Sequence, residues 1–432
     1  MRAPYLPETA PFTPEQRQWL NGFFAGWAVS GAGAAPDGAA SALPFSGDGQ
    51  AAPVPELAVS EAPAYSRTNP FPARLLTNAR LNAEGSAKDV RHVEISLEGS
   101  GLTYEAGDAL GVMPQNDADY VDALLAALGL DGDETVVTDR AEVALRDALE
   151  HRLTITTPSK PLLDAYADQQ ADLRGLLADE KKAELADFLW GRDVLDLAHE
   201  YPTVRFEPQA FVDLLRPLAH RLYSISSSPA AHPGEVHLTV GTVRYEARER
   251  GRKGVCSTYL ADRCHDTVGV FVHANKAFRL PADGATPVVM VGPGTGIAPF
   301  RAFLEERRAT GATGENWLFF GDQHEATDYL YRDEVEAMRA DGTLSRLSLA
   351  WSRDGAEKVY VQHLMLREAE ALFDWLERGA AVYVCGDASR MAKDVDAALH
   401  EVVRQAGGLD EAGAAAYVKA LKKAKRYLRD VY

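Results

Sequence analysis

The sequence predicts a multidomain chain of mixed α+β and α/β class: an antiparallel β-barrel interrupted by a helical insert, then an α/β domain with a parallel sheet. Between residues 71 and 282, alternating strand patterns flank an Ala/Leu/Asp-rich helical stretch. From residue 287 onward, short apolar runs alternate with helical stretches, which is typical of βαβ units. The 432 residues have room for two or three domains of roughly 150 residues each.

The N-terminal segment is expected to hold one helix and a linker. Residues 13–16, Thr-Pro-Glu-Gln, read as a helix start with Thr as N-cap, Pro in the first turn and Gln at the capping-box position. We assign residues 1–29 to this amphipathic helix, whose aromatic stripe favours packing on its own chain over docking of a partner. Residues 30–66 are rich in Ala, Gly, Pro and Ser, so a flexible linker is expected there.

Strand patterns mark the two halves of the barrel, which we expect at residues 67–116 and 201–282. The first half holds the alternating run VRHVEISL and the turn-strand run YEAGDALGVMPQ; the second holds RLYSISSS, EVHLTVGTVRY and VGVFVHA. Between them, helical periods such as DYVDALLAALG, closed by Gly129 as a C-cap, predict a helical insert at residues 117–200.

The domain expected at residues 283–432 carries a glycine loop between a strand and a helix. In VVMVGPGTGIAPFRAFLEER, three glycines (Gly292, Gly294 and Gly296) permit a tight turn, and Thr295 adds a hydroxyl. The helix that follows offers free N–H groups and a positive dipole end to a phosphate. Because the spacing is G-x-G-x-G and not G-x-G-x-x-G, a purely structural βα turn is the alternative.

A second loop of this domain favours NADPH over NADH. In AWSRDGAEKVYVQ, Ser352 and Arg353 follow a predicted strand end, with Lys358 and Tyr360 close behind. An acid at such a position suits the ribose 2′-hydroxyl, whereas an arginine suits a 2′-phosphate; a solvated polar loop is the alternative. Cys385, in YVCGDASRMAKDV, lies at the carboxyl end of a predicted buried strand, where ligands of such sheets bind, although plain packing is the commoner role of a buried cysteine.

Two runs of the barrel also suit a nucleotide. In RLYSISSS, strand alternation sends Arg221 and Tyr223 to one side, where a cation meets a pyrophosphate and a ring stacks on a flat heterocycle, while Ser224 faces the other way or ends the strand. In KGVCSTYL, Gly254 and the small residues after it can open a helix onto a phosphate. Each signal is weak alone.

Composition excludes several classes of function. The net charge of −18 opposes a general attraction to nucleic acid or to an anionic membrane. The three cysteines show no CxxC pair and no histidine at metal spacing, so we expect neither a metal site nor disulfides. The opening MRAPYLPETAPF is unlike a signal peptide and no run reaches membrane-spanning length, so a soluble cytoplasmic protein is expected.

Taken in order, the motifs resemble those of the diflavin reductases, and most closely the flavoprotein (alpha) subunit family of NADPH–sulfite reductase. They are RLYS, TVGTVRY, GVCS, GPGTGIAPFRAF, WSRD, KVYVQ, VCGDASRMAKDV and RDVY, and they span about residues 70–432. The resemblance implies the ferredoxin–NADP reductase type of fold: an FAD-binding barrel, a helical connecting insert and a Rossmann-like NADP-binding domain. Members normally carry an FMN-binding flavodoxin domain before the barrel. About forty low-complexity residues cannot build such a domain of ~150 residues, so FMN is expected to be absent.

The resemblance also implies site residues. For FAD these are Thr154, Arg221, Leu222, Tyr223, Ser224, Thr239, Val240, Gly241, Tyr245, Gly254, Val255, Cys256, Ser257 and Tyr432. For NADPH they are Gly294, Thr295, Ser352, Arg353, Lys358, Val359, Tyr360, Val361, Gln362 and Asp394. Around the reacting atoms the family pattern places Ser224, Cys385 and Asp430, with Tyr432 stacked on the flavin ring and moving aside for the nicotinamide. The letters AKRYL before RDVY are expected to be helix surface and packing.

The implied activity is hydride transfer from NADPH to FAD, followed by single-electron release to an acceptor that the sequence leaves open. A sulfite reductase hemoprotein (beta) subunit that reduces sulfite to sulfide is one candidate, and a separate flavodoxin or ferredoxin is the other. The basic stretch at residues 244–254 suits steering of an acidic carrier, or else forms a solvated hairpin loop that partly serves the FAD phosphate. A cytochrome P450-type reductase fragment and a non-catalytic scaffold subunit are the alternatives.

Overall fold

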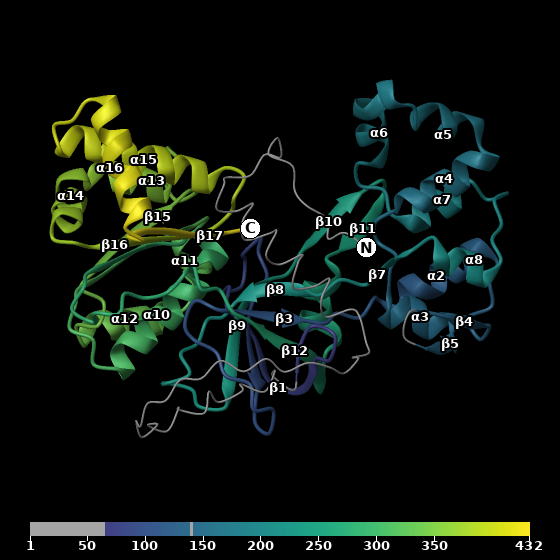
Figure 1. Cartoon of the computed structure of the whole chain (residues 1–432), viewed down its shortest axis with the longest axis horizontal. Coiled ribbons are helices and arrows are strands. Elements are labelled where there is room, and N and C mark those ends of the chain that lie inside the picture. The colour runs from purple at the N-terminus through teal and green to yellow at the C-terminus, as the bar shows by residue number, and fades with distance from the viewer. Residues whose placement is uncertain (1–64, 139–140) are drawn as a thin grey trace, which may run out of the picture. The chain divides into compact units, whose positions relative to one another are not determined.

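The structure, a computed structural model, describes residues 65–138 and 141–432 (Figure 1). The expected N-terminal helix and nearly all of the expected linker lie outside the described residues. Within the described part, no helix has the length and apolar character needed to cross a bilayer.

Six antiparallel strands form the first sheet. Their order is β8-β3-β12-β1-β2-β9, with bounds β1 Phe71–Arg80, β2 Val90–Ser96, β3 Ala109–Val112, β8 Arg221–Ser224, β9 Glu235–Gly241 and β12 Thr267–His273. A bridge between Ile225, directly after β8, and Leu238 of β9 links the two ends of this order. Alternate residues of β2, such as Val93 and Ile95, are fully buried in the core of the resulting barrel, as period-2 patterning predicts.

The insert is helical and has its own core. Its elements are α2 Ala118–Leu128, β4 Thr135–Val137, β5 Glu142–Ala144, α3 Leu145–His151, β6 Leu153–Thr154, α4 Lys160–Gln169, α5 Ala171–Leu176, α6 Lys182–Leu189, α7 Val194–Glu200, α8 Pro208–Asp213 and β7 Arg216–Pro217. Gly129 ends α2 at φ 68°, as predicted. Phe211 and Leu215 pack in the same apolar cluster as α2 and α4, so the helical core continues beyond the expected limit at residue 200.

The basic stretch 244–254 forms a hairpin of β10 Arg244–Ala247 and β11 Arg250–Lys253. Each of its five cationic side chains faces an acid: Arg244 pairs with Asp89 and Asp262, Arg248 with Glu200, Arg250 and Arg252 with Asp193 and Asp196, and Lys253 with Asp117. The stretch is thus a hairpin, and most of its residues are exposed. Its acid partners reduce the positive charge that is available to steer an acidic carrier, and its roles in steering and at the FAD phosphate stay predictions.

The second domain has a parallel sheet of five strands in the order β15-β14-β13-β16-β17. Four were predicted as apolar runs: β13 Val288–Val291, β14 Asn316–Asp322, β15 Arg346–Trp351 and β16 Ala381–Gly386. Residues of one strand alternate between two apolar clusters, one on each face of the sheet, as Val289 and Met290 of β13 do.

Helices cover both faces of this sheet (Figure 1). One face holds α10 Ala298–Ala309 and α12 Arg332–Ala340, whose buried residues join the cluster of Met290. The other holds α13 Val361–Arg367, α14 Ala369–Glu377, α15 Met391–Ala406 and α16 Glu411–Lys423. The short elements η3 Gly294–Ile297 and α11 Glu325–Asp328 follow β13 and β14.

The fifth strand, β17 Tyr427–Val431, corrects the expectation that AKRYL is helix surface. The helix α16 ends at Lys423, and Lys425 takes a left-handed backbone with φ 54°, which turns the chain back towards the sheet. Tyr427 is then buried opposite Val382 on the open edge of β16. A strand edge available for pairing thus outweighs the helical composition of this segment.

The hairpin provides a test of what holds the insert to the barrel. Arg252 is buried and donates to Asp193 and Asp196 at 2.6 Å each. Arg252→Ala leaves these two buried carboxylates paired with Arg250 alone, so we expect the free energy of unfolding to fall by about 3 kcal/mol. The exposed Arg248, 3.9 Å from Glu200, is the control, and Arg248→Ala should cost less than about 1 kcal/mol. Urea unfolding followed by tryptophan fluorescence measures both; equal losses would contradict the account.

Candidate functional site

Three of the residues predicted to surround the reacting atoms meet between the two sheets. Ser224 ends β8, and its hydroxyl donates to Asp430 Oδ2 at 2.6 Å. Asp430 lies on β17 directly opposite Cys385 at the end of β16. The amide of Asn275, 3.4 Å from Asp430 Oδ1, completes the contacts of this carboxylate. The structure therefore brings a hydroxyl, a thiol and a carboxylate from three separate strands to one point.

The thiol at this point is neutral. Burial raises the pKa of Cys385 well above its usual value, and the nearby Asp430 carboxylate raises it further. A neutral thiol is a weak hydrogen-bonding group and a poor nucleophile, which suits contact with a ligand better than covalent chemistry.

A cleft of about 1040 Å³ opens beside this point. All ten residues predicted to bind NADPH line it: Gly294, Thr295, Ser352, Arg353, Lys358, Val359, Tyr360, Val361, Gln362 and Asp394. They come from the loop after β13, the segment after β15, and the first turns of α13 and α15, all at the carboxyl ends of parallel strands, where α/β sheets bind ligands.

The three glycines after β13 have different roles. A Cβ on Gly292 would lie 2.4 Å from the Gly296 carbonyl oxygen, and one on Gly296 would lie 2.2 Å from the Cys385 carbonyl oxygen. Gly296 is thus needed for close packing of the loop on β16, and Gly292 for the tight turn of the loop itself. Gly294 instead has φ 57° and nothing closer than 3.7 Å to a Cβ, so its surroundings remain open to a ligand.

The cleft also holds cationic side chains that are not among the predicted site residues. Lys88, from the loop before β2, pairs with Asp322 at the carboxyl end of β14, and Arg80, Arg244 and Arg390 also line the cleft. Burial raises the pKa of Asp322, an effect that Lys88 opposes. Asp322, like Cys385, lies at the carboxyl end of a parallel strand, where ligands of such sheets bind, so its place could have been predicted in the same way. Lys88 belongs to none of the quoted motifs.

Polar atoms in the cleft fit a ligand with phosphates and hydroxyls. Asp322 Oδ2 and Gln323 Oε1 are buried and have no hydrogen-bond partner within the described residues. The exposed side chains of Arg353 and Lys358 likewise have no protein partner in that part of the chain. Unpaired donors and buried unpaired acceptors in one cleft match the donor and acceptor groups of a dinucleotide.

The residues predicted to bind FAD do not share a single cavity, unlike those predicted to bind NADPH. Gly241 and Tyr432 line the large cleft, whereas Tyr245 and Val255 line a second cavity of about 290 Å³ between hairpin and insert. Other predicted residues line neither cavity: Thr154, Arg221, Leu222, Tyr223, Ser224, Thr239, Val240, Gly254, Cys256 and Ser257. Roles at FAD for all of these residues stay predictions.

Several of these side chains are engaged within the protein. Val240 and Cys256 are buried in the barrel core, the Thr239 hydroxyl lies 2.7 Å from that of Tyr331, and the Thr154 hydroxyl donates to the Pro217 carbonyl at 2.9 Å. Only their backbone groups, or for Thr154 the remaining lone pairs, are free for a ligand.

Exposed apolar side chains support a flat ligand on this surface. Eight large apolar side chains are exposed among the described residues, and four of them belong to the predicted sets: Leu222 at 45%, Tyr245 at 54%, Tyr360 at 42% and Tyr432 at 63%. The Tyr432 hydroxyl lies 2.9 Å from Thr295 Oγ1, so its ring stands at the edge of the large cleft. Rings left open beside a cleft fit stacking on planar heterocycles.

Two domain families match the chain. The FAD binding domain family matches residues 63–259, and the oxidoreductase NAD-binding domain family matches residues 290–397. The barrel, except for its last strand β12, and the helical insert correspond to the first of these matches. The parallel-sheet domain corresponds to the second, which confirms the predicted fold class.

Full-length relatives extend this result. The sulfite reductase (NADPH) flavoprotein alpha-component of Bacillus subtilis (strain 168) is 48% identical over 403 residues, covering 92% of this chain and 67% of the relative. Its namesakes from Mannheimia succiniciproducens and Salmonella typhi are 48% and 46% identical over 372 residues, covering 85% of this chain and 62% of each relative. The chain thus spans about two thirds or less of the length of these relatives.

The buried thiols give one prediction. Burial raises the pKa of all three cysteines, that of Cys256 to about 12. A raised pKa lowers the thiolate fraction at about pH 8, and the thiolate is the form that reacts. We expect the native chain to react slowly with a thiol reagent and the unfolded chain to titrate all three cysteines. Rapid modification of one thiol in the native chain would contradict the described burial.

The hydrogen bond between Ser224 and Asp430 gives a prediction about the rate of FAD reduction. Ser224→Ala and Asp430→Asn should each retain bound FAD but slow its reduction by NADPH about 10- to 100-fold, because a small misplacement of reacting groups is costly. Anaerobic stopped-flow absorbance measures the rate. Thr310→Ala, which removes an exposed hydroxyl bonded only to the Glu306 carbonyl, is the control. Rates equal to that control would remove Ser224 and Asp430 from the reaction.

Proposed function

Because the chain belongs to the sulfite reductase NADPH flavoprotein alpha-component family, we propose that it is an NADPH-dependent flavin oxidoreductase whose FAD passes electrons to a redox partner. The observation that carries the proposal is the meeting of Ser224 with Cys385 and Asp430, next to Gly386 and Tyr432, which line the large cleft. This point joins the barrel of the FAD-binding match to the sheet of the NAD-binding match.

When bound, NADPH supplies a hydride and FAD accepts it, so the protein contributes alignment and electrostatics. Asp430 fixes the Ser224 hydroxyl at 2.6 Å and orients it at the end of β8. The Asp430 carboxylate also provides negative charge that stabilises a developing cation in its vicinity. The neutral Cys385 thiol packs at the same point and contributes no net charge of its own, so the stabilisation of that cation is assigned to Asp430.

The choice of NADPH over NADH rests on the loop after β15. Ser352 is held in place by two hydrogen bonds to the Asp322 carbonyl, from its backbone N–H at 2.9 Å and from its hydroxyl at 3.1 Å. Arg353 follows with its guanidinium free in the cleft, and Lys358 stands on the same segment. A fixed hydroxyl beside two free cations suits a 2′-phosphate.

For the acceptor, we propose the hemoprotein subunit of a sulfite reductase, in keeping with the names of the relatives. A separate flavodoxin or ferredoxin is the second candidate, although the acid partners of the hairpin 244–254 reduce the positive charge that is available to steer an acidic carrier. Stopped-flow mixing of the reduced chain with hemoprotein and with flavodoxin separates the two. Location in the cytoplasm belongs to the same proposal.

The proposal is tested with the purified chain loaded with FAD. Under it, NADPH reduces ferricyanide or cytochrome c in the presence of catalytic amounts of the chain, and the flavin copurifies. A chain that cannot hold FAD, or that holds FAD without being reduced by NADPH, would instead support the non-catalytic scaffold.

Arg353 gives a test of cofactor choice. Arg353→Ala should lower kcat/KM for NADPH by about 10- to 100-fold, the value of one hydrogen bond to a charged group. Activity with NADH, which lacks the 2′-phosphate, should stay nearly constant. Arg339→Ala, which removes an exposed arginine of α12 paired with Glu336 outside the cleft, is the control. A parallel loss with both cofactors would contradict the assignment.

Tyr432 gives a test of the aromatic ring at the cleft. Its backbone is held by hydrogen bonds with Gly386 and Ala388, so substitution should change the side chain without releasing β17. We expect Tyr432→Ala to retain FAD and to weaken discrimination against NADH, because an open cleft edge admits nicotinamide from either cofactor. Tyr432→Phe, which loses only the bond to Thr295, should behave like the original chain. Steady-state kinetics with both cofactors decide; unchanged selectivity in Tyr432→Ala would remove the ring from this role.

A further inference from the structure

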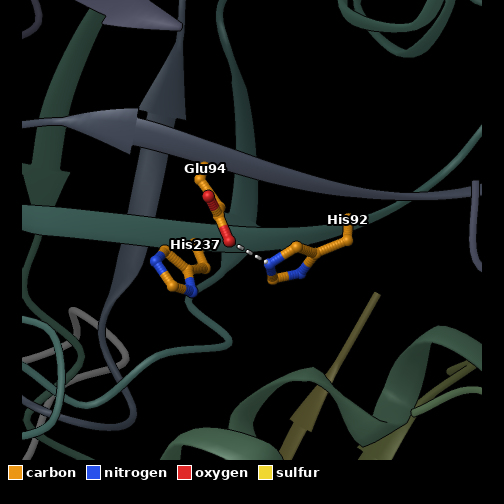
Figure 2. A group of neighbouring side chains, drawn as sticks. All are labelled: His92, Glu94 and His237. Carbon is orange, nitrogen blue, oxygen red and sulfur yellow. Dashed lines mark hydrogen bonds and ion pairs between the residues drawn. The ribbon is translucent and has the colours of Figure 1, made fainter. Parts of the chain in front are cut away.

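Two histidines and a glutamate gather on the face of β2 and β9 that points away from the barrel core (Figure 2). His92 and Glu94 are two residues apart on β2, so their side chains share one face. His237 of β9 stands directly opposite Glu94 in the antiparallel register. One ligand atom from each residue lies within 4.8 Å of the other two, and His237 is almost fully buried at 1% exposure.

Two of the three side chains are held from behind by a residue outside the cluster. One ring nitrogen of His92, Nδ1, lies 2.9 Å from the Tyr331 hydroxyl. Glu94 Oε2 accepts a hydrogen bond from the Thr77 hydroxyl at 2.6 Å. These contacts leave His92 Nε2 and Glu94 Oε1 facing each other at 3.1 Å.

This spacing suits one shared ion. Bonds of about 2.0–2.1 Å at tetrahedral angles place two ligand atoms of zinc about 3.3 Å apart. Metal-binding histidines also characteristically have their other ring nitrogen held by a hydrogen bond, as Tyr331 holds that of His92. The arrangement therefore shows both the converging atoms and the outer support of a metal site.

The charged residues around this cluster also favour a bound cation. Arg301 lies next to the cluster, with its Nη1 atom 3.5 Å from His237 Nδ1. Its guanidinium group is already paired with Glu305 at 2.9 Å and with Glu334 at 2.6 Å. Glu94 and Glu235 have no lysine or arginine partner in the described part of the chain; their charged-group partners there are His92 and His237. Two half-buried carboxylates thus remain without a full positive charge beside the buried His237.

We propose that His92, Glu94 and His237 bind one divalent ion of the zinc class, with Glu235 or a water molecule as the fourth ligand. Glu235 Oε2 lies 3.2 Å from His237 Nε2, within reach of that position. The site is structural: it joins neighbouring strands of the barrel and, through Tyr331, the segment between α11 and α12 of the second domain. Cysteine spacing, on which the expectation of no metal rested, carries no information about such a site.

The test uses the purified, FAD-loaded chain, stripped with a chelator and then equilibrated with one equivalent of Zn²⁺. Elemental analysis after gel filtration should find about one zinc per chain, and Co²⁺ should give the absorption of a tetrahedral site. His92→Gln and Glu94→Gln should each weaken zinc binding about 100-fold or more. FAD content and circular dichroism show that the variants are folded.

His232→Gln is the matched control. His232 belongs to a neighbouring group with Glu235 and His237 but not to the proposed site, so this variant should bind zinc like the original chain. Loss of binding in His232→Gln with retention in His92→Gln would place the ion in that other group and overturn the proposal. The proposal would also be overturned if the unsubstituted chain retained no more zinc than the His92→Gln variant does.

Discussion

The hydrogen bond from Ser224 to Asp430 is the contact on which the site depends, because it joins strands from two different sheets. Ser224 comes from the edge strand β8 of the barrel, and Asp430 from the edge strand β17 of the parallel sheet. The donor is at 2.6 Å from a carboxylate oxygen, a length typical of strong charge-assisted bonds. A cleft that binds one cofactor on each sheet can align them only if the two edges meet at a fixed distance.

Close packing behind this contact leaves little freedom. The glycine loop lies so near β16 that a side chain at Gly296 would collide with the Cys385 backbone. Cys385 in turn pairs in register with Asp430. The loop that borders the large cleft and the acid that meets Ser224 are thus fixed to the same strand end, so the positions of the residues proposed to bind phosphate and to surround the reacting atoms are linked through backbone geometry.

Local patterns predicted most of the fold. Apolar runs located β13 to β16, and the Gly129 cap located the end of α2. β17 was missed because its pairing with β16 is non-local, and the helical composition of the preceding residues gave no sign of it. The partners of Arg250 and Arg252 lie more than fifty residues earlier in the chain, so the ion-paired hairpin could not be foreseen from a run of positive charge. Lys88 and Asp322 reach the cleft through the same kind of long-range pairing. The ten predicted cleft residues, by contrast, come from contiguous motifs at the glycine loop, the Arg353 loop and the start of α15.

The central claim is that the Ser224–Asp430 contact aligns NADPH with FAD for direct hydride transfer. The most direct measurement is the anaerobic reduction of bound FAD by NADPH carrying deuterium at the transferred C4 position. The account predicts that the flavin absorbance bleaches in a single turnover, more slowly with deuterium than with hydrogen, and that Ser224→Ala slows this step while FAD stays bound. Bleaching that is absent, or that proceeds at the same rate with both isotopes and in the variant, would contradict it.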